Sequence, residues 1–205
     1  MDLLTSVLYA GALSSPDVYV TTLHSYGGGG LIYVGDNLDM ATHTITNLGQ
    51  LNGHNLYSYG KFYNTVSQSL TVSGTATRVK LNTAGTVAGI TLDTTTNIGR
   101  LTFTNAGTYM VTWNGYFVRA SGTANNFIWI RLNGTDIAGT GKKQKTDASM
   151  SEISIGGSTQ VTVTAGQYIE FFWAADDTNT SLTAVAASSP YPATPAFSCA
   201  ISIVA

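Results

Sequence analysis

The chain has 205 residues, a length that suits a single domain plus an extension. Only 10% of its residues are charged, and the formal net charge is −2, whereas charged residues make up roughly 25% of ordinary soluble proteins. This balance argues against nucleic-acid binding, which needs clustered Lys and Arg. Because Ser, Thr, Asn and Gly supply the polarity, we expect identical neighbours or a larger assembly to cover much of the surface.

Residues 1–35 form the first zone of the chain and begin with an apolar segment. Residues 3–12 favour a short helix or a strand, and the pattern does not decide between them. This segment has no evident partner in the rest of the chain. We therefore predict an attachment arm at 1–35, anchored by five side chains, Leu3, Leu4, Val7, Leu8 and Tyr9. The arm ends in the run Gly27–Gly30, a hinge or tight passage.

Residues 36–60 form a polar connector, and residues 61–205 carry the main domain. β-Branched and aromatic runs broken by Gly, Asn and Asp dominate this domain and predict strands. We expect strands near 64–72, 77–82, 87–92, 98–104, 107–119, 126–133, 151–155, 159–163, 167–174, 181–186 and 196–204. Short strands in this number and at this spacing predict an all-β fold, an antiparallel two-sheet sandwich or jelly roll.

Alternation of apolar and polar residues is clearest in two of the predicted strands. Residues 109–117 alternate throughout, and residues 127–132 divide into two faces. One face carries Phe127, Trp129 and Arg131, and the other carries Ile128, Ile130 and Leu132. Asn133-Gly134 and residues 164–167 are typical turn sequences between strands.

No set of residues predicts catalysis, a cofactor or a metal. His24, His43 and His54 fit no metal-binding spacing, and the glycine run 27–30 lacks the Lys and Ser or Thr of a phosphate-binding loop. Cys199 is the only cysteine and lies in an apolar run, which predicts a packed thiol. We expect a plain turn at Asp176-Asp177, with a Ca²⁺ site as the alternative. We predict a solvated loop for the basic run 142–145 and no enzymatic activity.

The start of the chain lacks the basic region that opens a signal peptide. No apolar run approaches the roughly 18 residues of a transmembrane helix, so we predict no membrane insertion.

Four segments in order resemble the C1q/tumour-necrosis-factor jelly roll. Residues 99–113 resemble its core signature, an apolar strand followed by a Gly-x-Tyr turn and an alternating aromatic strand. Residues 130–134 resemble the next strand and turn, and residues 196–203 resemble the closing strand. Residues 163–171 resemble the family's Ala-Gly-Asp step, although Gln167 stands where Asp is usual. The resemblance covers about residues 64–205.

This resemblance implies a homotrimer of jelly rolls packed through apolar and aromatic faces, which agrees with the low charge content. Symmetric closed assemblies are also the common form of soluble oligomers. The candidates for the trimer interface or the core are seven aromatic residues, Tyr109, Trp113, Phe117, Trp129, Phe171, Trp173 and Phe197.

A second resemblance lies in the connector. Residues 36–49, Asp-Asn-Leu-Asp-Met-Ala-Thr-His-Thr-Ile-Thr-Asn-Leu-Gly, resemble a short element of viral and bacteriophage fibre proteins. In those proteins the element lies ahead of a trimeric head or within a trimeric stalk. Three copies could bury apolar side chains that one copy leaves exposed, and the candidates for this trimerisation are Leu38, Met40, Ile45 and Leu48.

Together these features predict a non-enzymatic structural protein of a virus particle. The leading hypothesis is a homotrimer that decorates or cements the capsid surface through its N-terminal arm. Its partners would be copies of itself and the major capsid or tail protein. The alternative is the head of a tail fibre or spike that binds a host receptor or glycan, and a carbohydrate-binding module, secreted or displayed, is a further class. Tyr191, in an exposed-looking loop, is the candidate for stacking on a sugar.

Overall fold

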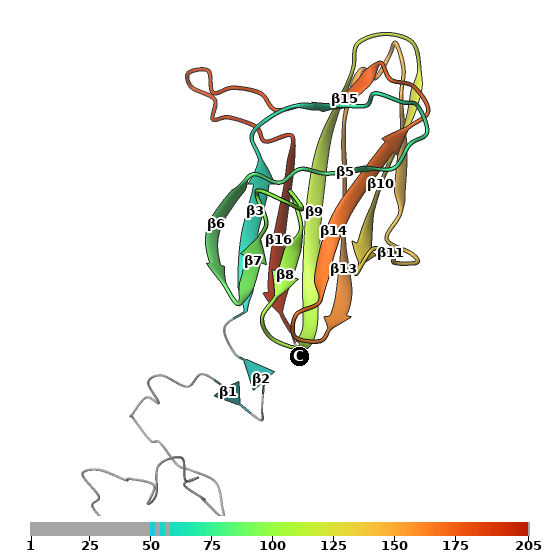
Figure 1. Cartoon of the computed structure of the whole chain (residues 1–205). Coiled ribbons are helices and arrows are strands. Elements are labelled where there is room, and N and C mark those ends of the chain that lie inside the picture. The colour runs from blue at the N-terminus through green and yellow to red at the C-terminus, as the bar shows by residue number, and fades with distance from the viewer. Residues whose placement is uncertain (1–49, 52–53, 56–57, 205) are drawn as a thin grey trace, which may run out of the picture. The chain divides into compact units, whose positions relative to one another are not determined.

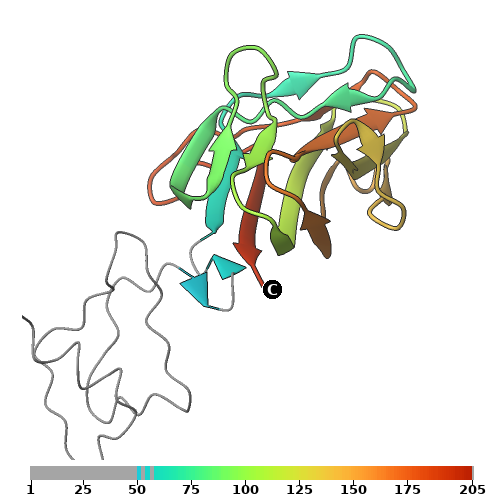
Figure 2. The ribbon, with the colours of Figure 1, turned by 60° about the horizontal axis from the view of Figure 1, so that its bottom comes forward.

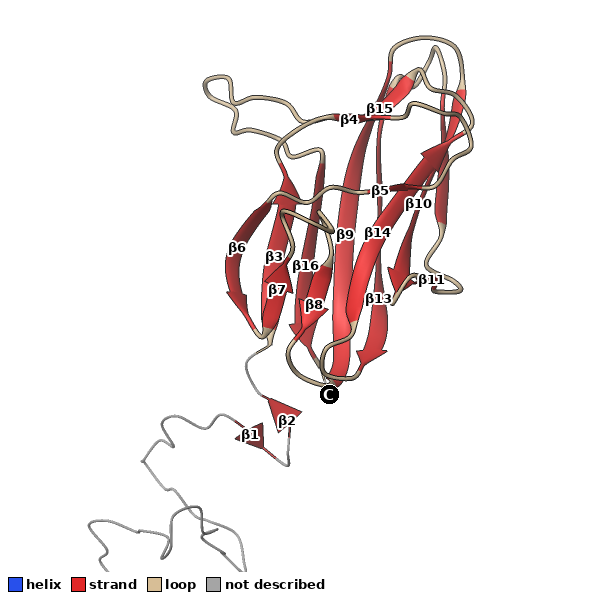
Figure 3. Ribbon diagram, in the orientation of Figure 1, coloured by secondary structure: helices blue, strands red, loops and turns tan. Residues whose placement is uncertain are grey.

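A computed structural model describes residues 50–51, 54–55 and 58–204. The attachment arm predicted at 1–35, its five anchoring candidates and the four trimerisation candidates of the connector lie outside the described residues. Residues 58–204 form two antiparallel sheets that face each other, as Figures 1 and 3 show. A separate two-stranded pair is formed by β1 (Gln50–Leu51) and β2 (His54–Asn55).

The first sheet is built around one long central strand, β9. Its strands are β6 (Thr83–Ala88), β3 (Tyr59–Asn64), β16 (Phe197–Ile203), β9 (Gly107–Arg119) and β13 (Glu152–Val163), with β15 (Thr180–Leu182) and β4 (Gln68–Ser69) at the end of β9. β16 and β15 pair with one edge of β9 in succession, and β13 pairs with its other edge over twelve residue pairs.

The second sheet is built around β14. Its strands are β7 (Ile90–Leu92), β8 (Leu101–Phe103), β14 (Tyr168–Ala175), β10 (Ala124–Leu132) and β12 (Lys142–Thr146), with β5 (Thr77–Arg78) beside β14 and β11 (Thr135–Asp136) beside β10. Every pairing in this sheet is antiparallel.

The order of the eight main strands is that of a jelly roll. One sheet runs β3-β16-β9-β13 and the other runs β8-β14-β10-β12, so that successive strands of these eight cross between the sheets, except β10 and β12, which pair with each other. Two interleaved Greek keys give this order. The first and last strands, β3 and β16, pair with each other and start and finish at the same end of the sandwich (Figure 2). The predicted all-β, antiparallel two-sheet jelly-roll fold is confirmed.

The core lies between the two sheets and is rich in aromatic side chains. β9 contributes alternate residues to it, because successive side chains of a strand point to opposite faces. These residues pack on rings of β14 and β16: Trp113 lies 6.0 Å from Phe171, which in turn lies 4.8 Å from Phe197. Phe117 makes an edge contact with Trp173 at 5.8 Å. Full burial of each such side chain contributes about 1.5–3 kcal/mol.

Two strand predictions and one loop prediction were wrong, each for a local reason. The strands expected at 151–155 and 159–163 are one continuous strand, β13, which runs through Gly156-Gly157. Both glycines stay in register with β9, and a Cβ on Gly156 would lie 2.6 Å from the carbonyl oxygen of Trp113. The close approach of the two backbones therefore needs glycine at that position.

The other two corrections concern 64–72 and 142–145. β3 ends at Asn64, whose side chain accepts a hydrogen bond from the backbone of Val66 and so turns the chain out of the sheet. The basic run predicted to be a solvated loop is strand β12, which pairs with β10 from residue 124 to residue 128. Lys143 and Lys145 lie on one face of this strand, and Lys142 lies on the other.

The predicted turns at 133–134 and 164–167 are confirmed. Asn133 and Gly134 have φ angles of 48° and 82°, the left-handed pair that a tight hairpin between β10 and β11 requires. The loop between β7 and β8 is held by Asp93, whose carboxylate accepts backbone hydrogen bonds from Thr95, Asn97 and Thr96. These hydrogen bonds lower the pKa of Asp93 to about 2, so its carboxylate is ionised at neutral pH and continues to accept them.

The end of this loop gives a prediction about stability. Gly99 has a φ of +93°, and a Cβ there would lie 2.1 Å from the carbonyl oxygen of Val79. Gly99→Ala should therefore lower the free energy of unfolding by at least about 2 kcal/mol, from strain and steric clash together. Gly141→Ala is the matched control, since a Cβ added to Gly141 would meet no atom within 4 Å. Equal denaturant midpoints for the two variants would contradict the predicted strain and clash at Gly99.

Candidate interaction surfaces

The structure places the seven aromatic candidates in two environments. Six of them lie in the core between the sheets: Tyr109, Trp113, Phe117, Phe171, Trp173 and Phe197. Trp129 lies on the outward side of β10 and is only partly buried, while Ile128 and Ile130 of the same strand face the core. The division of residues 127–132 into two faces is confirmed. The aliphatic face is the inner one.

Cys199 and the aspartates of 176–177 occupy structural positions. Cys199 is buried in the core, and burial raises the pKa of its thiol, so the thiol stays protonated. Asp176 accepts hydrogen bonds from the side chain and the backbone of Asn125, which lower its pKa. Asp177 accepts a hydrogen bond from the backbone of Asn179. Within residues 58–204, no group of three or more His, Cys, Asp or Glu could hold a metal ion.

The outward side of the first sheet, which we call the β9 face, has few charges. It is formed by the alternate residues of β3, β9, β13 and β16 whose neighbours in sequence enter the core. Lys61 and Glu152 are the only charged residues among them, and Glu152 accepts a hydrogen bond from the hydroxyl of Tyr116. This hydrogen bond raises the pKa of Tyr116.

Small side chains leave a shallow hollow in the β9 face. Its volume is about 160 Å³, and its lining includes Thr112, Asn114, Ser198 and Ala200, with Lys61 as its one charged residue. Around the hollow the face carries larger side chains that are partly or fully exposed: Tyr59, Tyr63, Met110, Tyr116 and Val118. The β9 face is therefore an uneven surface with few charges that could interlock with a surface of complementary shape.

The outward side of the second sheet, which we call the arginine face, has the opposite character. Five of the chain's nine lysines and arginines gather on it: Arg78, Arg100, Arg131, Lys143 and Lys145. Two guanidinium groups lie over aromatic rings. The guanidinium carbon of Arg100 lies 3.7 Å from the centre of the Tyr168 ring. The guanidinium carbon of Arg131 lies 3.9 Å from the centre of the Phe172 ring.

Beneath two of these arginines lies a buried carboxylate. Glu170 of β14 has a side chain that is 3% exposed, and the same oxygen, Oε1, lies 3.0 Å from a nitrogen of Arg78 and from a nitrogen of Arg100. The arginines come from the segments around β5 and β8, which flank β14. One buried negative charge thus fixes the positions of two guanidinium groups.

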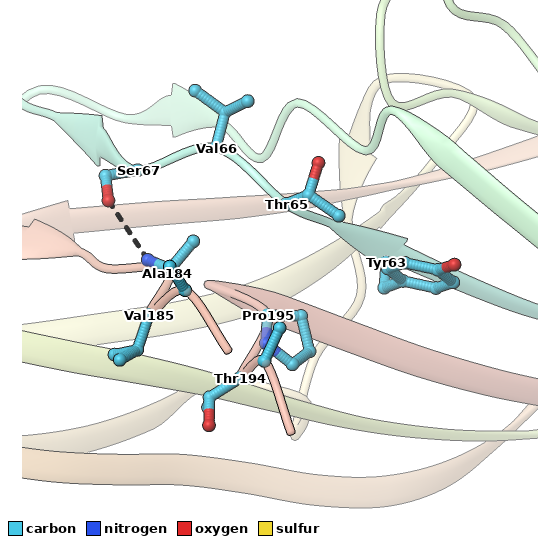
Figure 4. A pocket seen from close by; sticks show the side chains of 10 residues that line it. Tyr63, Thr65, Val66, Ser67, Ala184, Val185, Thr194 and Pro195 are labelled. Carbon is cyan, nitrogen blue, oxygen red and sulfur yellow. Dashed lines mark hydrogen bonds between the residues drawn. The ribbon is translucent and has the colours of Figure 1, made fainter. Parts of the chain in front are cut away.

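A third feature is a hollow at the end of the sandwich away from the start of β3. It has a volume of about 410 Å³ and is mostly lined by apolar and small side chains. Figure 4 shows its lining residues, with the backbone of Ala184 donating a hydrogen bond to Ser67 Oγ at 3.0 Å. The loop between β15 and β16 contributes part of the lining, and Figure 1 shows this loop projecting from the body.

Tyr191, the candidate for sugar stacking, belongs to that projecting loop. Its side chain is 73% exposed, and the loop is held by backbone bridges between Val185 and Thr194 and between Ser188 and Tyr191. No sequence pattern indicated the hollow or the arginine face, since both combine segments that lie far apart along the chain.

Among residues 50–51, 54–55 and 58–204 there is no helix long and apolar enough to cross a membrane.

Comparison with known proteins finds no matching family model and no matching curated protein. Among solved structures, the chain is similar to murine APRIL in crystals at pH 5.0 and at pH 8.5, with TM-scores of 0.46 and 0.44. In both cases the identity is 11%, and the match covers 72% of this chain and 99% of the other.

Proposed function

We propose that this chain is a non-enzymatic structural protein of a virus particle that assembles as a homotrimer through its β9 face. The observation that carries the proposal is the low charge of that face, with Lys61 and Glu152 as its only charged residues. A contact through this face would bury few charges, and charged groups are the ones depleted at the centres of protein interfaces. We infer three copies per assembly from the resemblance to the C1q/tumour-necrosis-factor jelly roll.

The path of the chain supports a head that projects from an attachment point. The chain enters the sandwich at Tyr59, beside the last residues of β16, because Ser202 pairs with Tyr59. Everything that precedes β3 is therefore connected to this end. Several connecting segments gather at the opposite end, which is free to face outward (Figure 1). They are the loops 120–123, 176–179 and 184–195 and the segment 65–76 that contains β4.

The proposal of a virus particle rests on the resemblance of residues 36–49 to an element of viral fibre proteins. Within that class we favour a trimer that decorates or cements a capsid, with the major capsid protein as its partner, because a connector of about 25 residues is short for a fibre stalk. The second candidate is the head of a tail fibre or spike. The projecting loop with Tyr191 at the free end favours it, since an exposed aromatic side chain is a common contact for a receptor or glycan.

Two measurements test the proposal together. Native mass measurement of the full chain at micromolar concentration should give three copies, and a monomer would contradict self-association. Removal of residues 1–35 should leave the same trimer mass while abolishing loading onto particles. If the truncated protein still loads, the arm is not the attachment point. If the truncated protein loses its trimer mass, the contact lies in the arm and not on the β9 face.

A further inference from the structure

We propose that the arginine face is a binding site for an acidic saccharide, a sugar chain that carries carboxylate groups. The site lies on the sheet opposite the β9 face, so the inference does not depend on the proposed trimer. Its components are the guanidinium groups of Arg131 and Arg100, the ammonium group of Lys143 and the aromatic rings of β10 and β14.

Arginines and lysines gather on this face, and three carboxylates accompany them. Asp136 is exposed and Asp147 is partly exposed, and they pair with Arg131 and Lys145, whereas Glu170 lies beneath Arg78 and Arg100. Glu170 is buried, whereas the side chains of Arg78, Arg100 and Arg131 are 24–29% exposed. Lys143 is exposed, lies 5.4 Å from the centre of the Phe127 ring and forms no ion pair with a carboxylate of residues 58–204. An anion approaching the face would find free donors on Arg100, Arg131 and Lys143, beside the exposed carboxylate of Asp136.

Arg100 and Arg131 are held in place and still have N–H donors without a partner among residues 58–204. Arg100 Nε is bound to Glu170 and Arg131 Nε to Asp136, and neither guanidinium makes another hydrogen bond to residues 58–204. Their remaining N–H groups can bind a carboxylate in the two-point geometry that arginine favours. Little side-chain entropy would be lost on binding, because the rings of Tyr168 and Phe172 already fix the two guanidinium planes.

The same arrangement argues for a sugar chain over a protein partner. A protein interface needs a dry, apolar centre, and here guanidinium groups cover the rings that would supply it. Desolvating several charges beneath a protein would be costly unless each were paired again. A saccharide leaves the surface wet, contacts charges through its carboxylates, and can lie against the partly exposed ring of Trp129. That ring is fixed because its Nε1 donates a hydrogen bond of 2.6 Å to Asp136.

Calorimetric titration of the full chain with a hyaluronan hexasaccharide tests this site, with the neutral N-acetylglucosamine hexasaccharide as the comparison. We expect binding of hyaluronan that weakens with added salt, and at least tenfold weaker binding of the neutral sugar. Arg131→Gln combined with Lys143→Gln should weaken hyaluronan binding by about tenfold or more, since each removes a charged donor. Lys143→Gln alone should weaken it, whereas Lys61→Gln, a matched loss of charge on the β9 face, should leave it unchanged.

Three outcomes would overturn the inference. The first is absence of binding to both hyaluronan and oligosialic acid, a second carboxylate-bearing chain. The second is equal binding of the acidic and neutral hexasaccharides. The third is binding of polyglutamate that exceeds that of hyaluronan and depends on the same two residues, which would assign the face to an acidic protein. Lys143 is exposed and its replacement should not affect folding, so the single variant remains informative if the double variant is unstable.

Discussion

Ala200→Arg should convert the proposed trimer into monomers without unfolding the sandwich. Ala200 is exposed on β16, beside the shallow hollow of the β9 face. An arginine there points to solvent in a single copy, so the free energy of unfolding should change little. On assembly its charge would be buried without a partner, at a cost of about 3 kcal/mol or more, which weakens association by about a hundredfold or more.

The control for this variant is Thr91→Arg, which places the same side chain at an exposed position of β7 in the second sheet. Native mass and light scattering should show a trimer for Thr91→Arg and a monomer for Ala200→Arg at the same concentration. A trimer in both would place the self-association surface elsewhere. A monomer in both would point to a general effect of added charge and not to the β9 face.

Fold class was accessible from local pattern, because alternation along a strand is a property of neighbouring residues. β9 reads as a strand from Tyr109 to Phe117 alone, and the Asn133-Gly134 turn needs only its own two residues. The inner face of β10 was harder to predict, since large side chains occupy both faces. Ile128 is buried and Trp129 is not, and this depends on which partner sheet lies across the core.

The candidate surfaces were not accessible in the same way. The arginine face combines Arg78, Arg100 and Glu170, and the last two are separated by 70 residues in the chain. Only the pairing of β5 and β8 with β14 brings them together. The lysines of 142–145 looked like a solvated loop because nothing local indicates that β10 lies alongside them. Sequence periodicity therefore identifies strands, whereas a surface depends on strand order.

Replacement of both Arg78 and Arg100 by Ala should destabilise the sandwich far more than either single replacement. Each single variant leaves Glu170 with one guanidinium at 3.0 Å. The double variant leaves a carboxylate that is 3% exposed with no positive partner, and breaking a buried ion pair in this way costs about 3–5 kcal/mol. Urea unfolding should therefore show a non-additive loss, larger than the two single losses together.

A third variant separates the orphaned charge from lost packing. Adding Glu170→Met to the double variant removes the buried charge while filling a similar volume, and apolar replacements of buried ionic sets are often neutral or stabilising. Most of the lost stability should return. If it does not, the arginines stabilise the sheet mainly through their contacts with Tyr168 and Phe172, and the carboxylate beneath them is secondary. Recovery would instead mean that the unpaired charge of Glu170, and not lost contacts with the rings, destabilises the double variant.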